Sequence, residues 1–146
     1  MIVGLLDRLF KKTPKRNKDT GNALQRYWKS FNHAIDGFIY CLKYEHNMII
    51  ILVCTIIVIT LGFIFKINLG EWLFVISMCG AIAALEFINS AIEATIDLIT
   101  TDIHPLAKIA KDCASSASLV LCVVALVGGV AIFGQDIVNV IGGLLW

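Results

Sequence analysis

The chain has 146 residues, of which 58% are hydrophobic and 16% charged, and its formal net charge at pH 7 is +1. The mean hydropathy is +0.83, above that of an ordinary soluble domain, because the apolar residues are concentrated in long runs. These values exclude a soluble multidomain protein and predict one small integral membrane domain. The charge is unevenly placed, since nine of the twelve Lys and Arg residues lie within residues 1–45.

Two segments precede the first long apolar run. Residues 1–21 contain the basic stretch K-K-T-P-K-R-N-K-D-T, and we expect a basic cytoplasmic tail there. In residues 22–44, apolar and aromatic side chains recur at spacings of three and four, which predicts an amphipathic helix. Its aromatic and basic residues are typical of a helix that lies in the membrane interface.

Three apolar segments predict membrane-spanning helices at about residues 47–65, 71–99 and 110–133. The connection K-I-N-L-G-E separates the first two, with a turn expected at Gly70. Pro105 lies near the expected start of the third helix. We assign residues 22–134 to one membrane domain. Residues 135–146 form an apolar C-terminal tail that is too short to cross a membrane.

The basic residues predict the orientation of these helices. The N-terminal region holds nine of them, the second loop holds Lys108 and Lys111, and the first loop holds Lys66. Basic residues favour the cytoplasmic side, so we expect the N-terminus and the second loop in the cytoplasm. The first loop and the C-terminus are then expected outside.

A stripe of polar side chains runs down the second predicted span. Glu86, Asn89, Glu93 and Asp97 fall within an arc of roughly 80° on a helix that turns about 100° per residue. Carboxylates in a membrane helix are costly, and they usually mark a functional site. A polar seam that holds neighbouring helices together is the alternative interpretation.

The predicted topology brings charges of both signs to the cytoplasmic end of the spans. Glu45 and Glu93 lie near one depth, and Glu86 lies about two turns, or ~10 Å, deeper. Carboxylate oxygens suit Mg²⁺, whereas Lys and Arg suit phosphate, so the combination predicts a metal–phosphate site. Four further charged residues belong to the same side: Arg26, Lys108, Lys111 and Asp112.

Two segments, E-F-I-N-S-A-I-E-A-T-I-D at residues 86–97 and H-P-L-A-K-I-A-K-D at residues 104–112, carry a family resemblance. They resemble the prokaryotic integral-membrane diacylglycerol kinase family, over roughly residues 25–133. The pattern Y-x-x-N-M at residues 44–48 and the pair Glu71-Trp72 are similar to the Gram-positive branch, whose members phosphorylate undecaprenol. Ser115-Ser116-Ala117-Ser118 departs from the small apolar residues of that branch, in the region that faces the lipid substrate in the family.

The resemblance implies an all-α, multi-pass lipid kinase of the bacterial cell membrane, assembled as a homotrimer with sites shared between subunits. It implies direct transfer of the γ-phosphoryl group of ATP to a lipid hydroxyl, with Mg²⁺ bound to ATP and no nucleic-acid partner. Undecaprenol is the expected acceptor, and diacylglycerol is the alternative. From the residues alone, an oligomeric cation channel or transporter and a non-catalytic assembly factor also stay open. A P-loop kinase is excluded, because the sequence lacks G-x-x-x-x-G-K-[ST].

The same resemblance implies a role for each polar residue. Glu86 would be the general base, and Glu45 and Glu93 would hold the metal. Asn89 and Asp97 would orient the carboxylates and hold the loop. The implied ATP-binding residues are Arg26, Glu45, Glu93, Asp102, His104, Lys111 and Asp112, and the implied lipid-binding residues are Arg26, Glu86 and Ser115.

Simpler interpretations stay open for three of these residues. His104 would only start a helix before Pro105. Asp97 would only begin the cytoplasmic surface, and Arg26 would only contact lipid headgroups.

Overall fold

The structure is a computed structural model that describes residues 22–100 and 102–144. Within these ranges the chain forms four helices: α2 (Ala23–Tyr44), α3 (His46–Phe65), α4 (Leu69–Ile99) and α5 (Pro105–Leu144). By length and composition, α3, α4 and α5 are able to cross a membrane. The prediction of an all-α chain with three long apolar helices is therefore confirmed. The predicted basic tail at residues 1–21 lies outside the described residues.

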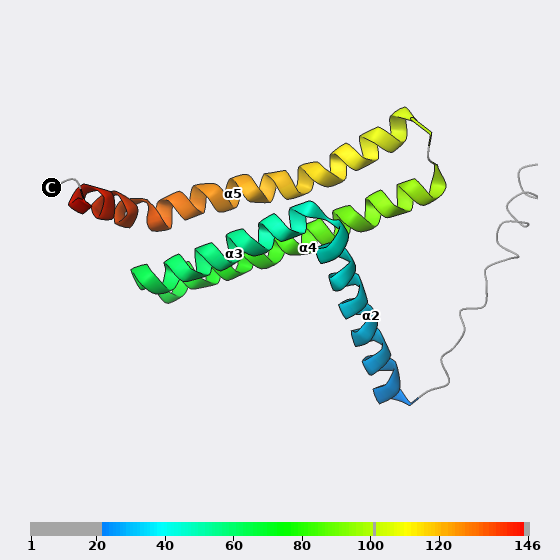
Figure 1. Cartoon of the computed structure of the whole chain (residues 1–146), viewed down its shortest axis with the longest axis horizontal. Coiled ribbons are helices and arrows are strands. Elements are labelled where there is room, and N and C mark those ends of the chain that lie inside the picture. Colours follow the sequence, from blue (N-terminus) through cyan, green and yellow to red (C-terminus); the bar gives the residue numbers. More distant parts are fainter. Residues whose placement is uncertain (1–21, 101, 145–146) are drawn as a thin grey trace, which may run out of the picture. The chain divides into compact units, whose positions relative to one another are not determined.

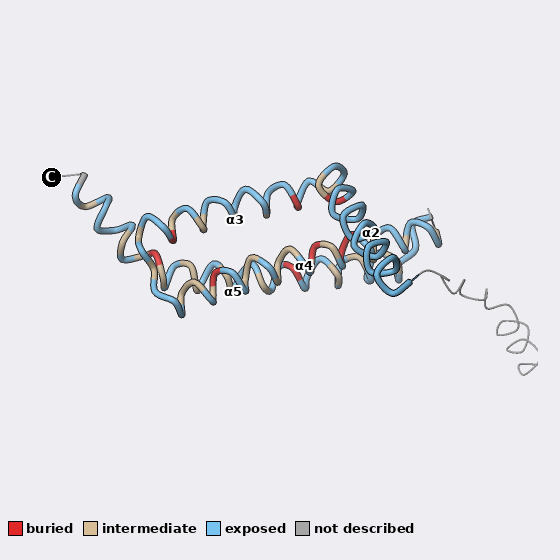
Figure 2. Tube along the Cα trace, turned by 90° about the horizontal axis from the view of Figure 1, so that it is seen from below, coloured by how far each residue is buried: buried red, intermediate tan, exposed pale blue. Residues whose placement is uncertain are grey.

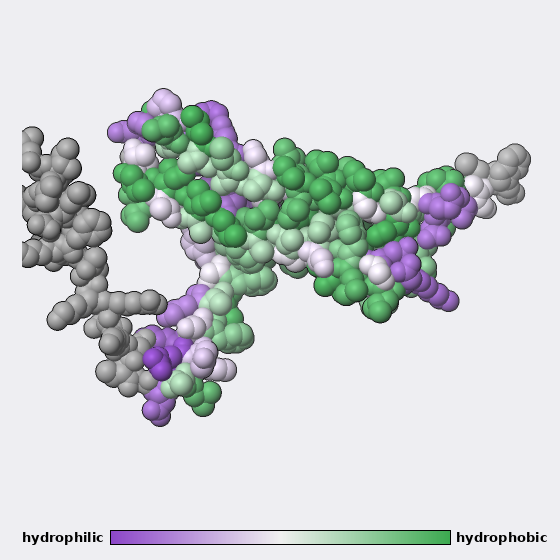
Figure 3. Space-filling view, turned by 180° about the vertical axis from the view of Figure 1, so that it is seen from behind, coloured by the Kyte–Doolittle hydropathy of each residue, from purple (hydrophilic) through white to green (hydrophobic). Residues whose placement is uncertain are grey.

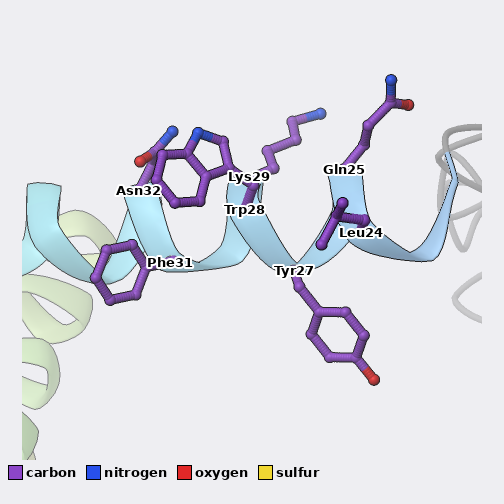
Figure 4. Close-up of a pocket in the computed structure, with 7 residues that line it drawn as sticks. All are labelled: Leu24, Gln25, Tyr27, Trp28, Lys29, Phe31 and Asn32. Atoms are coloured by element: carbon purple, nitrogen blue, oxygen red, sulfur yellow. The ribbon is translucent and has the colours of Figure 1, made fainter.

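The described chain divides within α2 into two units, one ending at Asp36 and the other beginning at Gly37. In the first unit the aromatic side chains of α2 are exposed, with Tyr27 at 76% and Trp28 at 66%. The rings of Trp28 and Phe31 stack with their centroids 6.0 Å apart. Figure 4 shows Gln25 and Lys29 extending from the side of the helix opposite to Tyr27. This half of α2 therefore presents a large aromatic surface.

In the second unit, α3, α4 and α5 run alongside one another in alternating directions (Figure 1). Helix α4 packs most extensively against α5 and less against α3, whereas α3 and α5 meet at few positions. Figure 2 shows that most positions on these helices are exposed in the single chain. In Figure 3, apolar residues cover the middle of the α3–α5 bundle and hydrophilic residues gather towards its ends. This distribution is expected of helices that face lipid.

The connection between α3 and α4 turns at Lys66, so the predicted turn at Gly70 is wrong. Lys66 has left-handed backbone angles, φ 54° and ψ 46°, and its backbone N–H donates to the carbonyl of Gly62. Gly70 lies inside the first turn of α4. Asn68 caps this turn, since Asn68 Oδ1 accepts from the backbone N–H of Glu71, and Glu71 Oε2 accepts from the backbone N–H of Asn68. This N-x-x-E capping box starts the helix before Gly70.

Helix α5 begins at Pro105, earlier than the predicted start near residue 110. Proline is favoured at the first helical position, because the N–H that it lacks would have no partner there. The backbone N–H of Leu106 donates to His104 Nδ1 at 3.2 Å, so His104 caps the helix. The interpretation of His104 as a residue that starts this helix is thus supported by a direct contact.

Helix α5 also continues to Leu144, although its predicted end was residue 133. No glycine has a positive φ in the part of the chain that the structure describes, so Gly134 does not end the helix. Gln135 Nε2 donates to Asn139 Oδ1 at 3.1 Å, which links one turn of the continuing helix to the next. Residues 135–144 of the segment predicted as a separate tail are therefore the last part of α5.

Glycines allow the three long helices to approach one another closely. A Cβ atom at Gly62 of α3 would lie 2.8 Å from Cη2 of Trp72 on α4. A Cβ atom at Gly128 of α5 would overlap the ring of Phe74, also on α4. Both contacts lie in the half of the bundle around the α3–α4 turn. The polar side chains of the later part of α4 lie at the other end of the bundle.

Candidate active site

Most charged residues of the second unit lie towards the end of the bundle where α4 ends and α5 begins. Helix α3 starts in the same half of the bundle. The last part of α4 and the first part of α5 continue past the start of α3 (Figures 1 and 2). Glu45 precedes α3, Glu86 and Glu93 lie in the later part of α4, and Lys111 lies in the first turns of α5. The antiparallel order of the helices thus places these four side chains towards one end of the bundle.

Glu86 is the most deeply buried carboxylate of the polar stripe, with an exposed fraction of 4%. Its neighbour Phe87 contacts Phe38 of α2, with ring centroids 5.7 Å apart, so aromatic rings lie beside this part of α4. Among the described residues no hydrogen bond or ion pair reaches the Glu86 carboxylate. A carboxylate on a side chain that is only 4% exposed, with no partner inside the chain, is open to a ligand and is therefore a candidate for chemistry.

Asn89 lies one turn further along α4 and is 5% exposed. Its Nδ2 donates to Glu93 Oε1 at 3.0 Å, so the amide holds one oxygen of this carboxylate. Asn89 Oδ1 is buried without a hydrogen-bond partner. The contact fixes the position of the Asn89 amide, while its orienting role in the site and the metal-binding role of Glu93 stay predictions.

Asp97 and Lys111 join the end of α4 to the start of α5. Lys111 Nζ lies 2.5 Å from Asp97 Oδ1, and the two side chains are 32% and 62% exposed. Such a pair contributes only about 0–1 kcal/mol, so Lys111 can exchange this partner for a phosphate at little cost. The pair links the two helices across the loop between them, while the loop-holding role of Asp97 stays a prediction. Contact of Lys111 with a phosphate stays a prediction.

The remaining residues of this end lie at the surface. Lys108 Nζ forms an ion pair with Asp112, one turn apart on α5. The backbone N–H of Asp102 donates to Thr100 Oγ1 at 3.1 Å, which shapes the loop before α5. Predicted ATP contacts of Asp102, His104 and Asp112 are untested by these arrangements and stay predictions.

Glu45 occupies the position before the first residue of α3, with extended backbone angles of φ −101° and ψ 108°. Its side chain does not cap its own helix. Within residues 22–100 and 102–144, His, Cys, Asp and Glu side chains do not gather in groups of three that could hold a metal ion. Two carboxylates, Glu45 and Glu93, still fit Mg²⁺ that arrives with ATP, because Mg²⁺ commonly takes one or two carboxylates together with phosphate oxygens and water.

Two predicted residues are less closely tied to this cluster. Arg26 belongs to the first unit, on the early part of α2. Ser115 is exposed on α5. Their predicted contacts with ATP and lipid stay predictions.

Ser118 of α5 is buried at 9% exposure and was given no role from the sequence. Sequence periodicity did not separate it from the nearby serines, because its burial depends on the neighbouring helix.

The chain matches known kinases over most of its length. A family model described as prokaryotic diacylglycerol kinase matches residues 32–133. The chain is 38% identical over 117 residues to an undecaprenol kinase of Bacillus subtilis, which covers 80% of this chain and 95% of that protein. It is 31% identical over 97 residues to a diacylglycerol kinase of Pseudomonas aeruginosa, with 66% and 79% covered. It is 33% identical over 111 residues to a diacylglycerol kinase of Helicobacter pylori, with 76% and 83% covered. With its acidic stripe, its A-K-D segment and its three long apolar helices, the chain belongs to the prokaryotic diacylglycerol kinase family.

Proposed function

We propose that this lipid kinase transfers the γ-phosphoryl group of ATP to the hydroxyl group of undecaprenol. The main support is the division of α4 into a buried carboxylate, Glu86, and the charged pair of Asp97 with Lys111 near the helix end. A lipid hydroxyl and a water-soluble nucleotide can meet only where the bilayer ends. The stripe on α4 offers a base for the first and charged partners for the second.

The proposed reaction is a direct displacement at phosphorus. Glu86 takes the proton of the lipid hydroxyl group while the oxygen of that hydroxyl group bonds to the γ-phosphorus. The bond between the γ-phosphorus and the β–γ bridging oxygen breaks, and ADP is released. Lys111 leaves Asp97 to contact the phosphates, and Glu45 and Glu93 hold the Mg²⁺ that accompanies ATP. Bound there, Mg²⁺ neutralises charge on the phosphate oxygens.

The choice of undecaprenol is supported by the comparison with the Bacillus subtilis undecaprenol kinase, which is 38% identical across nearly its full length. The diacylglycerol kinases reported above are 31% and 33% identical. Diacylglycerol is the alternative acceptor. It is favoured by those relatives.

We further propose that the protein is a homotrimer in the bacterial cell membrane with its N-terminus in the cytoplasm. Helices α3 and α5 meet at few positions. Within one chain the surface between these two helices is therefore incompletely covered, and a neighbouring chain can cover it. The exposed aromatic side chains of early α2 support a location in the membrane interface.

Phosphorylation of lipid by the purified protein tests the proposal. Mixed micelles containing undecaprenol and diacylglycerol at equal mole fraction are incubated with Mg²⁺ and γ-labelled ATP, and labelled lipids are separated. We expect undecaprenyl phosphate as the main product. Preferential labelling of diacylglycerol would refute the acceptor, and a protein that labels neither lipid would refute the proposed reaction.

A further inference from the structure

Ser118 carries a buried hydroxyl group that the protein leaves without a partner. Its exposed fraction is 9%, and Ser118 Oγ has no hydrogen bond within the described part of the chain. Serines in helices commonly donate to the carbonyl four residues earlier, as Ser90 and Ser116 do here. Ser118 does not make this bond, although its hydroxyl oxygen is buried. Its hydroxyl group is therefore available to a group that is not part of the chain.

The contacts between α4 and α5 place Ser118 beside the polar stripe. Lys111 of α5 meets Asp97 of α4, and further along α5 Gly128 meets Phe74. Ser118 lies between these two contacts. Because the helices are antiparallel, it lies at the level of the segment from Glu86 to Ser90. The stretch of α4 that holds Glu86 therefore lies level with a buried serine of the next helix.

Asn89 gives a second, independent sign of an unfilled polar position at this level. Within residues 22–100 and 102–144, two buried side-chain atoms lack a hydrogen bond, Asn89 Oδ1 and Ser118 Oγ. The other end of the Asn89 amide is engaged with Glu93, which fixes the side chain. Buried polar atoms normally have partners. Two without partners, at the level of a buried carboxylate, indicate a place that a polar ligand atom fills.

We propose that Ser118 binds the acceptor lipid, with Oγ donating a hydrogen bond to the oxygen of the hydroxyl group that is phosphorylated. This inference rests on the proposed function and adds a binding residue to it. The hydroxyl group of the lipid directs its hydrogen to Glu86, and one oxygen lone pair receives the hydrogen of Ser118. Undecaprenol has a single oxygen atom, so that oxygen is the only polar atom by which a site can hold its reacting end.

The test compares Ser118→Ala with Ser116→Ala in the full chain. Ser116 is exposed and donates to the backbone carbonyl of Asp112, so its variant makes the same chemical change outside the buried stretch. We expect Ser118→Ala to raise the KM for undecaprenol about three- to tenfold, the effect of losing one hydrogen bond, with the KM for ATP unchanged. Ser116→Ala should leave both constants unchanged.

A hydrocarbon with the same prenyl chain and no hydroxyl group separates lipid binding from helix packing. As a competitive inhibitor it should bind equally to the wild type and to Ser118→Ala, because it lacks the atom that Ser118 contacts. Equal weakening of this inhibitor and of undecaprenol would overturn the inference. It would also be overturned if Ser118→Ala lowered the melting temperature and left the KM for lipid unchanged, since the hydroxyl would then join helices.

The measurement distinguishes failure of this inference from failure of the proposed function. A wild type that phosphorylates undecaprenol, together with a Ser118→Ala variant of unchanged KM, overturns the role of Ser118 alone. If diacylglycerol is the acceptor of the wild type, the proposed acceptor fails. The same rise in KM, now for diacylglycerol, would still support the contact with the reacting hydroxyl. A wild type that labels no lipid overturns both.

Discussion

Replacement of Glu86 by glutamine removes the proposed base while keeping the size and shape of the side chain. Glu86 is 4% exposed, and its carboxylate makes no hydrogen bond or ion pair with a described residue. The substitution therefore breaks no contact that holds the helices together. Loss of a general base costs about 10²- to 10⁴-fold in rate. We expect Glu86→Gln to lower kcat by about this factor, with the KM for ATP changed by less than about threefold.

Folding should respond in the opposite direction to activity. On a side chain that is 4% exposed, a charged carboxylate costs more to remove from water than a neutral amide does, and neither has a partner within the chain to lose. The melting temperature of Glu86→Gln in detergent should therefore equal or exceed that of the wild type. Initial rates of lipid phosphorylation at saturating ATP, measured beside thermal unfolding, separate the two effects.

Glu71→Gln is the matched control, because it makes the same chemical change at the other end of α4. Glu71 belongs to the capping box with Asn68 and lies far along the helix from Glu86. Its replacement should lower stability by up to about 1 kcal/mol and leave kcat within twofold of the wild type. A Glu86→Gln protein that is folded and retains more than a tenth of the wild-type kcat would refute the assignment of Glu86 as the base.

Three further substitutions test other parts of the site and of the bundle. Lys111→Met should raise the KM for ATP about tenfold or more, with little change in the KM for lipid, since a charge-assisted phosphate contact is lost; steady-state kinetics with varied ATP will show whether the effect is confined to the nucleotide. Asn89→Ala removes the hydrogen bond to Glu93 and should increase the Mg²⁺ concentration for half-maximal activity about 10- to 100-fold, as loss of an orienting partner does at metal sites; an unchanged Mg²⁺ titration would contradict this role. Gly128→Val places side-chain atoms where the ring of Phe74 lies and should destabilise the protein by about 1–3 kcal/mol in thermal or denaturant unfolding, and a variant as stable as the wild type would show that α4 and α5 pack differently.

The sequence was sufficient for features that depend on hydropathy and on helical spacing. The observed bounds of α2, α3 and α4 lie within about two residues of the predicted ones, because long apolar runs and helical spacing mark their extent. The gathering of Glu45, Glu93 and Lys111 towards one end of the bundle follows from the alternating direction of consecutive helices. Predicting this gathering required only the correct number of helices.

Features that depend on contacts between helices could not be predicted in this way. The pair of Asp97 with Lys111 joins two helices across a loop, so no spacing rule within one helix reveals it. Ser118 and Ser116 look alike in sequence, and only packing against α4 buries the first and leaves the second exposed. The turn at Lys66 could not be predicted, because a lysine in a left-handed conformation has no distinctive sequence signal. The turn was predicted at Gly70 instead, because glycine adopts such conformations most readily.

The unequal lengths of α3 and α4 explain why one helix can supply both the proposed base at membrane depth and charges in water. Helix α3 has 20 residues and α4 has 31, which correspond to about 30 Å and about 46 Å at ~1.5 Å per residue. The first length matches the hydrocarbon core of a bilayer, ~30 Å, so about ten residues of α4 extend past it. Counted from Leu69, the core ends near Ile88, just beyond Glu86. Glu93 and Asp97 then lie outside it, where ATP is dissolved. A shift of Glu86 by one turn in either direction would therefore separate the base from one of its two substrates.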